Sequence, residues 1–220
     1  MLGNPLRITL GRTEVYLLPQ RALYIPVHRM LVIADWHLGK LQHFRKNGIF
    51  VPQNAITDEL QHLTELINTY PIQHILFLGD LFHSSWNADW DVLVTYLSSL
   101  APVECSLVIG NHDLIDFQQY DVGGLAIYNS LSVDGMLFSH HPLTSVPKTY
   151  VNIAGHIHPG IMVRAKGRQR YRLPCFYHLD QTLILPAFGN YTGIQTISPS
   201  KDADVYLIVG DDVLLRRNRY

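Results

Sequence analysis

Ser106-Leu107-Val108-Ile109-Gly110-Asn111-His112-Asp113 is the stretch that decides the fold. Its apolar run predicts a buried strand, and Gly110 permits a sharp turn after that strand. An amide, an imidazole and a carboxylate then follow in consecutive positions. In α/β sheets, the end of a buried strand is the usual place for a binding site. The stretch therefore predicts one strand of an α/β sheet that ends in chemically active side chains.

The same construction recurs at four other places in the chain, where residues of metal-ligand types follow an apolar run. The four places are Met30–Ala34 before Asp35 and His37, Ile75–Gly79 before Asp80, Met136–Ser139 before His140, and Val151–Gly155 before His156 and His158. Asp-x-His and His-x-His place two side chains on the same face of an extended segment. Five strand ends are therefore expected to carry one site.

Composition and charge indicate one globular domain over residues 1–220. The chain is 47% hydrophobic and 16% charged, which is typical of a folded protein with a substantial core. A net charge of −1 gives no electrostatic argument for nucleic acid as a partner, although a local basic patch can be cancelled elsewhere. We expect Cys105 and Cys175 to be buried thiols rather than a disulfide. Neither a signal peptide nor an apolar membrane span is apparent, so a cytoplasmic location without a membrane partner is expected.

The order of elements predicts a parallel sheet in the first half of the chain. Strands are expected at Glu14–Leu18 and Ala22–Ile25, and a helix is expected from Pro52 to a point before Pro71. A second helix, capped by Asn87, is expected to follow the strand that ends at Asp80. Its expected apolar face is Trp90, Val94, Leu97 and Leu100, and that of the first helix is Ile56, Leu60, Leu63 and Ile67. After Asp121 short β-like segments alternate with turns, which predicts a second sheet packed on the first.

The mixture of ligand types predicts two divalent cations. Carboxylate, amide and imidazole donors suit Mn²⁺, Fe, Co²⁺, Ni²⁺ or Zn²⁺ better than Mg²⁺ or Ca²⁺. The residues exceed the needs of one ion, and two ions about 3.5–4 Å apart would fit their number. Such a pair would generate a bridging hydroxide near neutral pH and neutralise phosphate charge. The expected reaction is in-line attack on a phosphoester. The seven expected ligands are Asp35, His37, Asp80, Asn111, His140, His156 and His158.

These residues resemble the five motifs of the calcineurin-like metallophosphoesterases, in order, between positions 35 and 158. The resemblance implies an α/β fold with four layers, α/β/β/α, in which helices flank two mixed β-sheets. It implies that Asp35, His37, Asp80 and His158 hold one metal. It also implies that Asp80, Asn111, His140 and His156 hold the other, with Asp80 bridging both. His112 would be the catalytic imidazole that protonates the leaving oxygen.

Two narrower resemblances point to DNA. Gly79-Asp80-Leu81-Phe82-His83 resembles the second motif of the nuclease subunit of double-strand-break repair complexes, which implies a catalytic role for His83. Motifs from position 35 to about position 193 resemble the bacterial ligase-associated DNA-damage-response metallophosphoesterases. They include Asp35-Trp36-His37-Leu38-Gly39-Lys40, Ser139-His140-His141-Pro142 and Leu185-Pro186-Ala187-Phe188-Gly189. That family implies a Mn²⁺-dependent phosphodiesterase or endonuclease, associated with an ATP-dependent DNA ligase, a helicase and an exonuclease-like protein.

Several alternatives remain open at the level of single residues. Either His140 or His141 could be the ligand of the fourth motif, and the strand end favours His140. Arg45 either clamps substrate phosphate or belongs to a solvated loop. Phe188 and Tyr191 either stack on a base or pack in the core.

The basic residues at every second position from Arg164 to Arg172 have two interpretations. In one continuous strand they would form a stripe for a nucleic-acid backbone. A break at Gly167 would instead make a charged hairpin tip, and the hairpin is the favoured interpretation.

Two other functions compete with a DNA phosphodiesterase. The same chemistry could serve a phosphomonoesterase, or a cyclic-nucleotide or nucleotide-pyrophosphate hydrolase. A non-enzymatic scaffold of this fold, like the retromer subunit that shares it, is disfavoured because every expected ligand and His112 are present.

Overall fold

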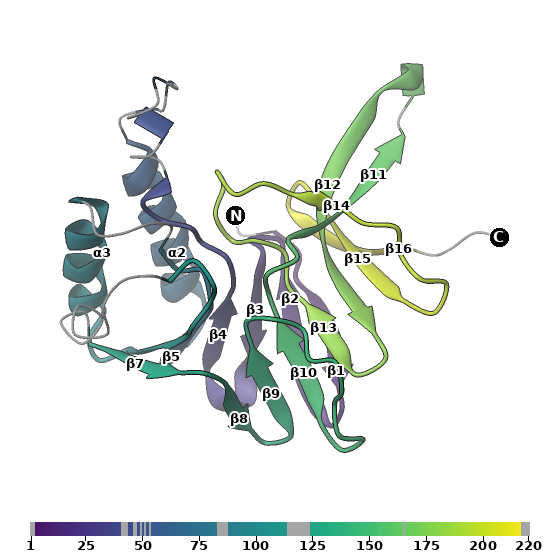
Figure 1. Ribbon diagram of the computed structural model, residues 1–220, viewed down its shortest axis with the longest axis horizontal. Helices are drawn as coiled ribbons and strands as arrows, with labels where there is room; N and C mark the ends of the chain where they lie inside the picture. Colours follow the sequence, from purple (N-terminus) through teal and green to yellow (C-terminus); the bar gives the residue numbers. More distant parts are fainter. Residues whose placement is uncertain are drawn as a thin grey trace.

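Two mixed β-sheets stacked face to face form the protein, and a pair of helices covers one outer face (Figure 1). The computed structural model describes residues 3–40, 44–45, 48, 50, 52, 54–82, 88–113, 124–164 and 166–216. The fold class expected from the sequence, α/β with two mixed sheets, is confirmed.

The first sheet has the strand order β1-β2-β3-β4-β5-β6-β7. Strands β1 to β4 pair antiparallel, whereas β4 to β7 are parallel. The parallel half agrees with the alternation of strands and helices in the sequence. The strands are β1 (Leu6–Leu10), β2 (Thr13–Leu18), β3 (Ala22–Ile25), β4 (Met30–Ile33), β5 (His74–Leu78), β6 (Glu104–Val108) and β7 (Leu125–Tyr128), with a 3-10 turn, η1 (Pro26–His28), between β3 and β4.

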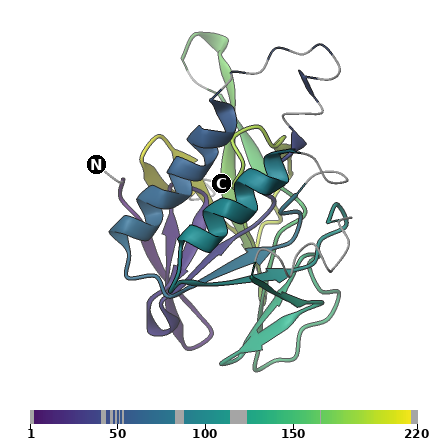
Figure 2. The same cartoon turned by 90° about the vertical axis from the view of Figure 1, so that its left-hand side faces the viewer.

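Helices α2 (Ala55–Thr69) and α3 (Ala88–Ser99) lie side by side on the same face of this sheet (Figure 2). They pack on strand residues such as Leu31, Ile75 and Phe77. Leu93 and Leu97 of α3 are buried, whereas Val94 is only partly buried, so the apolar face of α3 is shifted from the expected one. The expected cap, Asn87, lies outside the described residues.

The second sheet is formed by strands between residues 131 and 216, in the second half of the chain as expected. Contrary to the expectation, the first strand after Asp121, β7, joins the first sheet by pairing with β6. The path of the second sheet is β14-β11-β12-β13-β10-β9-β8, and β15 pairs with both β12 and β16. The strands are β8 (Leu131–Val133), β9 (Met136–Ser139), β10 (Val151–Ala154), β11 (Pro159–Arg164), β12 (Arg170–Leu179), β13 (Thr182–Ile184), β14 (Gln195–Thr196), β15 (Asp204–Val209) and β16 (Asp212–Arg216), with a 3-10 turn, η2 (Lys166–Arg168), between β11 and β12.

A continuous apolar layer joins the two sheets. Val32, Leu76 and Val108 of the first sheet meet Phe138 and Ile153 of the second. All five side chains are almost fully buried. This contact fixes the ends of β4, β5 and β6 relative to the ends of β9 and β10, which is what positions the site.

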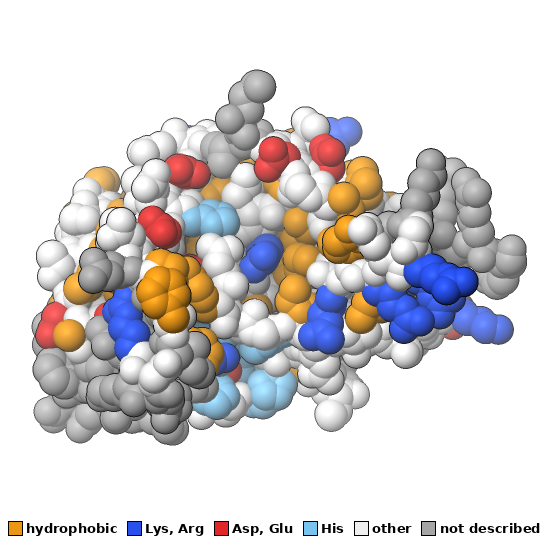
Figure 3. Space-filling model, turned by 90° about the horizontal axis from the view of Figure 1, so that it is seen from above, with side chains coloured by type: hydrophobic (Ala, Val, Ile, Leu, Met, Phe, Trp, Pro, Cys, Tyr) orange, Lys and Arg blue, Asp and Glu red, His pale blue; other side chains and the backbone are white. Residues whose placement is uncertain are grey.

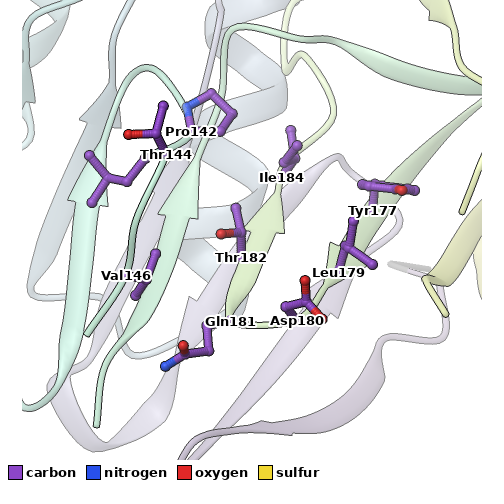
Figure 4. Close-up of a pocket in the computed structure, with 10 residues that line it drawn as sticks. Pro142, Thr144, Val146, Tyr177, Leu179, Asp180, Gln181, Thr182 and Ile184 are labelled. Atoms are coloured by element: carbon purple, nitrogen blue, oxygen red, sulfur yellow. The ribbon is translucent and has the colours of Figure 1, made fainter. Parts of the chain in front are cut away.

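The outer face of the second sheet carries no α-helix in the part of the chain that the structure describes. Of the two outer helical layers that the resemblance implied, the described residues therefore contain only the one on the first sheet. A hollow of about 360 Å³ opens on the uncovered face instead. Val146, Tyr177, Leu179 and Ile184 line it together with polar residues such as Gln181 (Figure 4).

The two cysteines behave as expected. Cys105 and Cys175 are both free and buried, and burial raises the pKa of each thiol to about 12. Within the described residues, no helix has the length and apolar character needed to cross a membrane.

Two neighbouring substitutions test which face of α3 packs on the sheet. Leu93→Ala should lower the free energy of unfolding by about 2–5 kcal/mol because it opens a cavity under the helix. Val92→Ala, at an exposed position of the same helix, should change it by about 0.5 kcal/mol or less. Urea denaturation followed by circular dichroism measures both. An equal decrease in the free energy of unfolding in both variants would contradict the assignment of Leu93 to the buried face of α3.

Candidate metal centre

The expected ligands meet at one edge of the two stacked sheets. Asp35, Asp80 and Asn111 follow the parallel strands β4, β5 and β6, so they leave the first sheet at the same edge. His140 and His156 follow the parallel strands β9 and β10 of the second sheet. A backbone hydrogen bond from His156 N to the Asp35 carboxylate, 2.9 Å long, ties the two edges together.

One group of side chains forms around Asp35. The Nε2 atom of His158 lies 3.2 Å from Asp35 Oδ1 and 3.5 Å from the Nε2 atom of His37. His37 Nε2 is in turn 3.6 Å from Asp80 Oδ2. Asp35, His37, Asp80 and His158 therefore direct their ligand atoms at one small volume.

A second group forms around His140. Its Nε2 atom lies 3.1 Å from Asn111 Oδ1, 3.2 Å from His156 Nδ1 and 3.4 Å from Asp80 Oδ1. Asp80 thus contributes one carboxylate oxygen to each group. The two groups have the membership that the sequence resemblance implied.

Backbone carbonyls orient two of the imidazoles. His140 Nδ1 lies 3.1 Å from Leu78 O, and His158 Nδ1 lies 3.1 Å from Gly193 O. When each Nδ1–H donates to its carbonyl, the Nε2 lone pair faces the acidic side chains. Metal-binding histidines commonly have this arrangement.

The backbone at the site is held in a rarely used conformation. Among the described residues, ten non-glycine residues have positive φ, and five of these are expected ligands. The five are Asp35, His37, Asp80, His156 and His158, with φ between 50° and 67°. Such residues cost about 1–3 kcal/mol each and gather at functional sites.

Two glycines make room for the ligands of neighbouring motifs. A Cβ atom on Gly79 would collide with the ring of His140, and one on Gly110 would collide with the Asp80 carboxylate. Gly79 also has a φ of 78°, which favours glycine on its own account. Packing therefore explains why a glycine precedes Asp80 and why another precedes Asn111.

Asp113 holds the turns that carry Asp80 and Asn111. Its Oδ2 atom accepts hydrogen bonds from the backbone N–H groups of Asp80 and Gly110, both at 2.8 Å. Its Oδ1 atom accepts a third from Phe82 N at 3.2 Å. Burial raises the pKa of Asp113 to about 6, against the effect of these donors. Asp113 is therefore a positioning residue for two loops.

Opposite charges dominate the electrostatics around Asp80. Burial alone would raise the pKa of Asp80, but its contacts with His140, His112 and His37 outweigh burial and lower the pKa to about 2. Burial likewise opposes the charged form of His140, yet Asp80 and Asp35 raise its pKa. The pKa of His156 is lowered, first by burial and then by the neighbouring His141 and His140.

These donors fit divalent cations. Imidazole nitrogens lie within 3.5 Å of one another in both groups, where two lone pairs repel unless a proton or cation lies between them. Carboxylate oxygens and an amide oxygen complete the set, and no thiolate takes part among the described residues. Mixed N and O ligands suit Mn²⁺, Fe or Zn²⁺. The Asp and His cluster thus fits a divalent metal site.

The remaining site predictions have different outcomes. His112 lies beside the first group, with its ring centroid 5.3 Å from that of His37, and its backbone N–H donates to Asp80 Oδ1 at 2.8 Å. Arg45 donates from Nη2 to Pro52 O at 2.7 Å, a contact within its own loop. His83 lies outside the described residues.

The open alternatives are partly decided. Phe188 is fully buried, so it packs in the core, while Tyr191 is 37% exposed. His141 is exposed but close, with its ring centroid 4.0 Å from that of His156. It therefore remains an alternative to His140 as a ligand, as part of a group with His140 and His156.

Sequence reasoning missed Glu59, a buried carboxylate of α2. It accepts hydrogen bonds from Trp36 Nε1 and Asn190 N, both at 2.8 Å, and burial raises its pKa. It joins the loop of the first motif to the loop after Gly189. The signal was present in the sequence, because Glu59 interrupts the apolar face formed by Ile56, Leu60 and Leu63.

We predict that Asp113→Asn lowers kcat/KM for a small phosphodiester by about 10–100-fold, the usual effect of disturbing the residues behind a metal ligand. The amide cannot accept three backbone hydrogen bonds, so the turns of Asp80 and Asn111 shift. Steady-state kinetics with bis(p-nitrophenyl) phosphate and Mn²⁺ measures the loss. Asp202→Asn, in an exposed turn, is the matched control. Full activity of Asp113→Asn would refute the positioning role.

Known proteins share the sequence family and the fold of this chain. The sequence matches the family model of the calcineurin-like phosphoesterases over residues 28–186. The structure resembles the crystal structure of Pseudomonas putida nuclease MPE, with a TM-score of 0.81 and 25% identity over 97% of this chain and 100% of the other. It also resembles the phosphoesterase Yfce from E. coli, with a TM-score of 0.44 and 14% identity over 82% of this chain and 88% of the other.

Among curated proteins, none matches the sequence significantly. The family match covers far more than half of the chain and includes all the expected ligands. The chain therefore belongs to the calcineurin-like phosphoesterase family and is a metal-dependent phosphoesterase.

Proposed function

We propose that this protein is a phosphodiesterase that cleaves DNA as an endonuclease in DNA repair. The observation that carries the proposal is the pair of ligand groups sharing Asp80, with His112 next to them. A dinuclear centre suits in-line displacement at a phosphodiester, because it neutralises the phosphate and stabilises both the attacking and the leaving oxygen.

The proposed ligand sets follow the two groups. Asp35, His37, Asp80 and His158 would hold one cation, and Asp80, Asn111, His140 and His156 the other. The expected ions are Mn²⁺, with Fe, Co²⁺, Ni²⁺ or Zn²⁺ as substitutes. When bound, two such ions would supply charge neutralisation and a water of lowered pKa. The protein supplies the strained turns and two imidazoles oriented by backbone carbonyls.

His112 is the proposed general acid. It does not belong to either ligand group, yet its backbone is tied to the shared carboxylate by the 2.8 Å bond to Asp80 Oδ1. A half-buried imidazole in this place can donate a proton to the leaving oxygen. By resemblance to the repair nucleases, His83 would assist. Arg45, in the loop that follows the first motif, would bind a substrate phosphate.

The case for DNA is supported by similarity. The structural neighbour of 25% identity is named a nuclease, and the sequence resembles the ligase-associated metallophosphoesterases along most of its length. On that ground we propose an association with an ATP-dependent DNA ligase, a helicase and an exonuclease. A cytoplasmic location is a separate part of the proposal. Reconstitution with those partners on gapped DNA would test the association.

The substrate class can be tested with one purified preparation. We predict Mn²⁺-dependent cleavage of plasmid DNA and single-stranded DNA, together with turnover of bis(p-nitrophenyl) phosphate, and loss of all three with a chelator. Hydrolysis of the small diester without any cut in DNA would refute the nuclease and support the small-molecule phosphoesterase.

The role of His112 predicts a dependence on the leaving group. His112→Ala should slow DNA cleavage by about 10²–10⁴-fold, the usual contribution of a general acid. It should slow bis(p-nitrophenyl) phosphate hydrolysis much less, because p-nitrophenolate leaves without protonation. Parallel kinetics on the two substrates measure the difference. Equal losses on both would exclude proton donation as its role.

The choice between adjacent histidines gives another prediction. His140→Ala should abolish activity and remove the rise in melting temperature that Mn²⁺ causes, because His140 Nε2 lies at the centre of the second group. His141→Ala should retain most of both, since its side chain is exposed. Thermal denaturation with and without Mn²⁺ compares them. The opposite pattern would assign the ligand to His141.

A further inference from the structure

We infer that one face of the β11–β12 hairpin binds the phosphate backbone of DNA and guides the strand toward the metal centre. The inference rests on the proposed function and names where the substrate lies. The hairpin extends away from the two stacked sheets in Figures 1 and 2. Its tip is the η2 turn, where Gly167 and Arg168 both have positive φ.

Positive charge is concentrated on the β11–β12 hairpin. Residues 159–174 contain five basic residues and no acidic one, in a chain whose net charge is −1. The basic residues are Arg164, Lys166, Arg168, Arg170 and Arg172. Figure 3 shows basic side chains gathered on the hairpin side of the face on which several histidines are also visible.

The hairpin register puts three of the arginines on one face. Arg164 pairs directly with Arg170, and Met162 pairs with Arg172. Residues opposite each other in a sheet point to the same side, as do residues two apart. Arg164, Arg170 and Arg172 therefore share a face. The structure confirms the hairpin, and the single continuous strand with all five basic residues on one face is not formed. The antiparallel pairing nevertheless brings three of the arginines to one face.

This arrangement is unfavourable for the isolated protein. Like charges directly opposite each other in a sheet destabilise it, and Arg164 and Arg170 are both exposed at such a pair. A polyanion that lies along the face would relieve the repulsion. Arg164 and Arg170 lie at one position along the hairpin and Arg172 lies two residues further, which is about 7 Å at about 3.3 Å per residue. This length matches about two phosphate steps of one strand of a helix at about 3.4 Å each.

The end of the hairpin nearest the two sheets connects its basic face to the metal centre. Arg172 Nη1 donates to Ile194 O at 3.1 Å, and the preceding carbonyl, Gly193 O, accepts from the His158 imidazole at 3.1 Å. His158 immediately precedes β11. A backbone bound along the arginines would therefore continue to the side of His158. This continuity favours a substrate polymer over an unrelated anion.

The test uses a double variant of the cross-strand pair. Arg164→Ala with Arg170→Ala removes two charges without cutting any contact to the metal centre. The matched control is Arg7→Ala with Arg12→Ala, two exposed positions at the N-terminal hairpin of β1 and β2. Binding of a fluorescent 30-nucleotide strand, single or paired, is measured by anisotropy over a range of salt concentrations. Hydrolysis of bis(p-nitrophenyl) phosphate is measured in parallel.

We expect the hairpin variant to bind DNA about tenfold more weakly, and its salt dependence to fall by about 1.4 in log–log slope for a single strand or 1.8 for a duplex. The control should bind like the unmodified protein, and all forms should hydrolyse the small diester equally. Substitution of the same pair by lysine should restore most binding, because a point charge suffices for phosphate. The alanine variant should also melt no lower than the unmodified protein, since the repulsion is gone.

Equal binding by the hairpin and control variants would overturn the inference. Loss of small-diester hydrolysis in the hairpin variant would also overturn it, because the effect would then lie in the metal centre. Failure of the proposed function gives a different result: arginine-dependent binding of DNA that the Mn²⁺ form never cuts. The two failures are thus distinguishable.

Discussion

The arrangement depends on the Asp80 carboxylate, which lies between two groups of ligand atoms and belongs to both. Its Oδ1 atom faces His140 Nε2 at 3.4 Å, and its Oδ2 atom faces His37 Nε2 at 3.6 Å. The residue is 2% exposed, so its charge needs partners of opposite sign. His37, which follows β4 of the first sheet, and His140, which follows β9 of the second, both face this carboxylate. The two halves of the chain must therefore come together at this one side chain.

The rest of the site serves to hold Asp80 in place. Asp80 sits at a φ of 50°, and the Asp113 carboxylate fixes its backbone N–H. Gly110 leaves space for the carboxylate, and Gly79 leaves space for His140. The cost of these strained turns must be met by packing elsewhere. The apolar layer between the sheets, with Phe138 and Ile153 fully buried, is where that stability arises.

Sequence patterns predicted most of the first sheet and which side chains follow its strand ends, whereas the division into two ligand sets was implied by the family resemblance and stays a prediction. They succeeded because apolar runs that end in Asp, Asn or His mark strand ends directly. The packed face of α3 was predicted incompletely. Trp90 and Leu97 are buried and Val94 and Leu100 pack against the core as expected, but the buried Leu93 was not included. Glu59 was missed because its partners, Trp36 and Asn190, are distant in sequence and only the fold brings them together. The direction in which Arg164 and Arg170 point needed the β11–β12 register, which composition does not contain.

If one carboxylate serves two groups of ligands, the site should bind two metal ions per chain. The most direct test is calorimetric titration of the metal-free protein with Mn²⁺. We predict that two ions bind per chain, and that Asp80→Asn impairs the binding of both rather than of one. Saturation at a single ion, or loss of only one ion in the variant, would contradict the account.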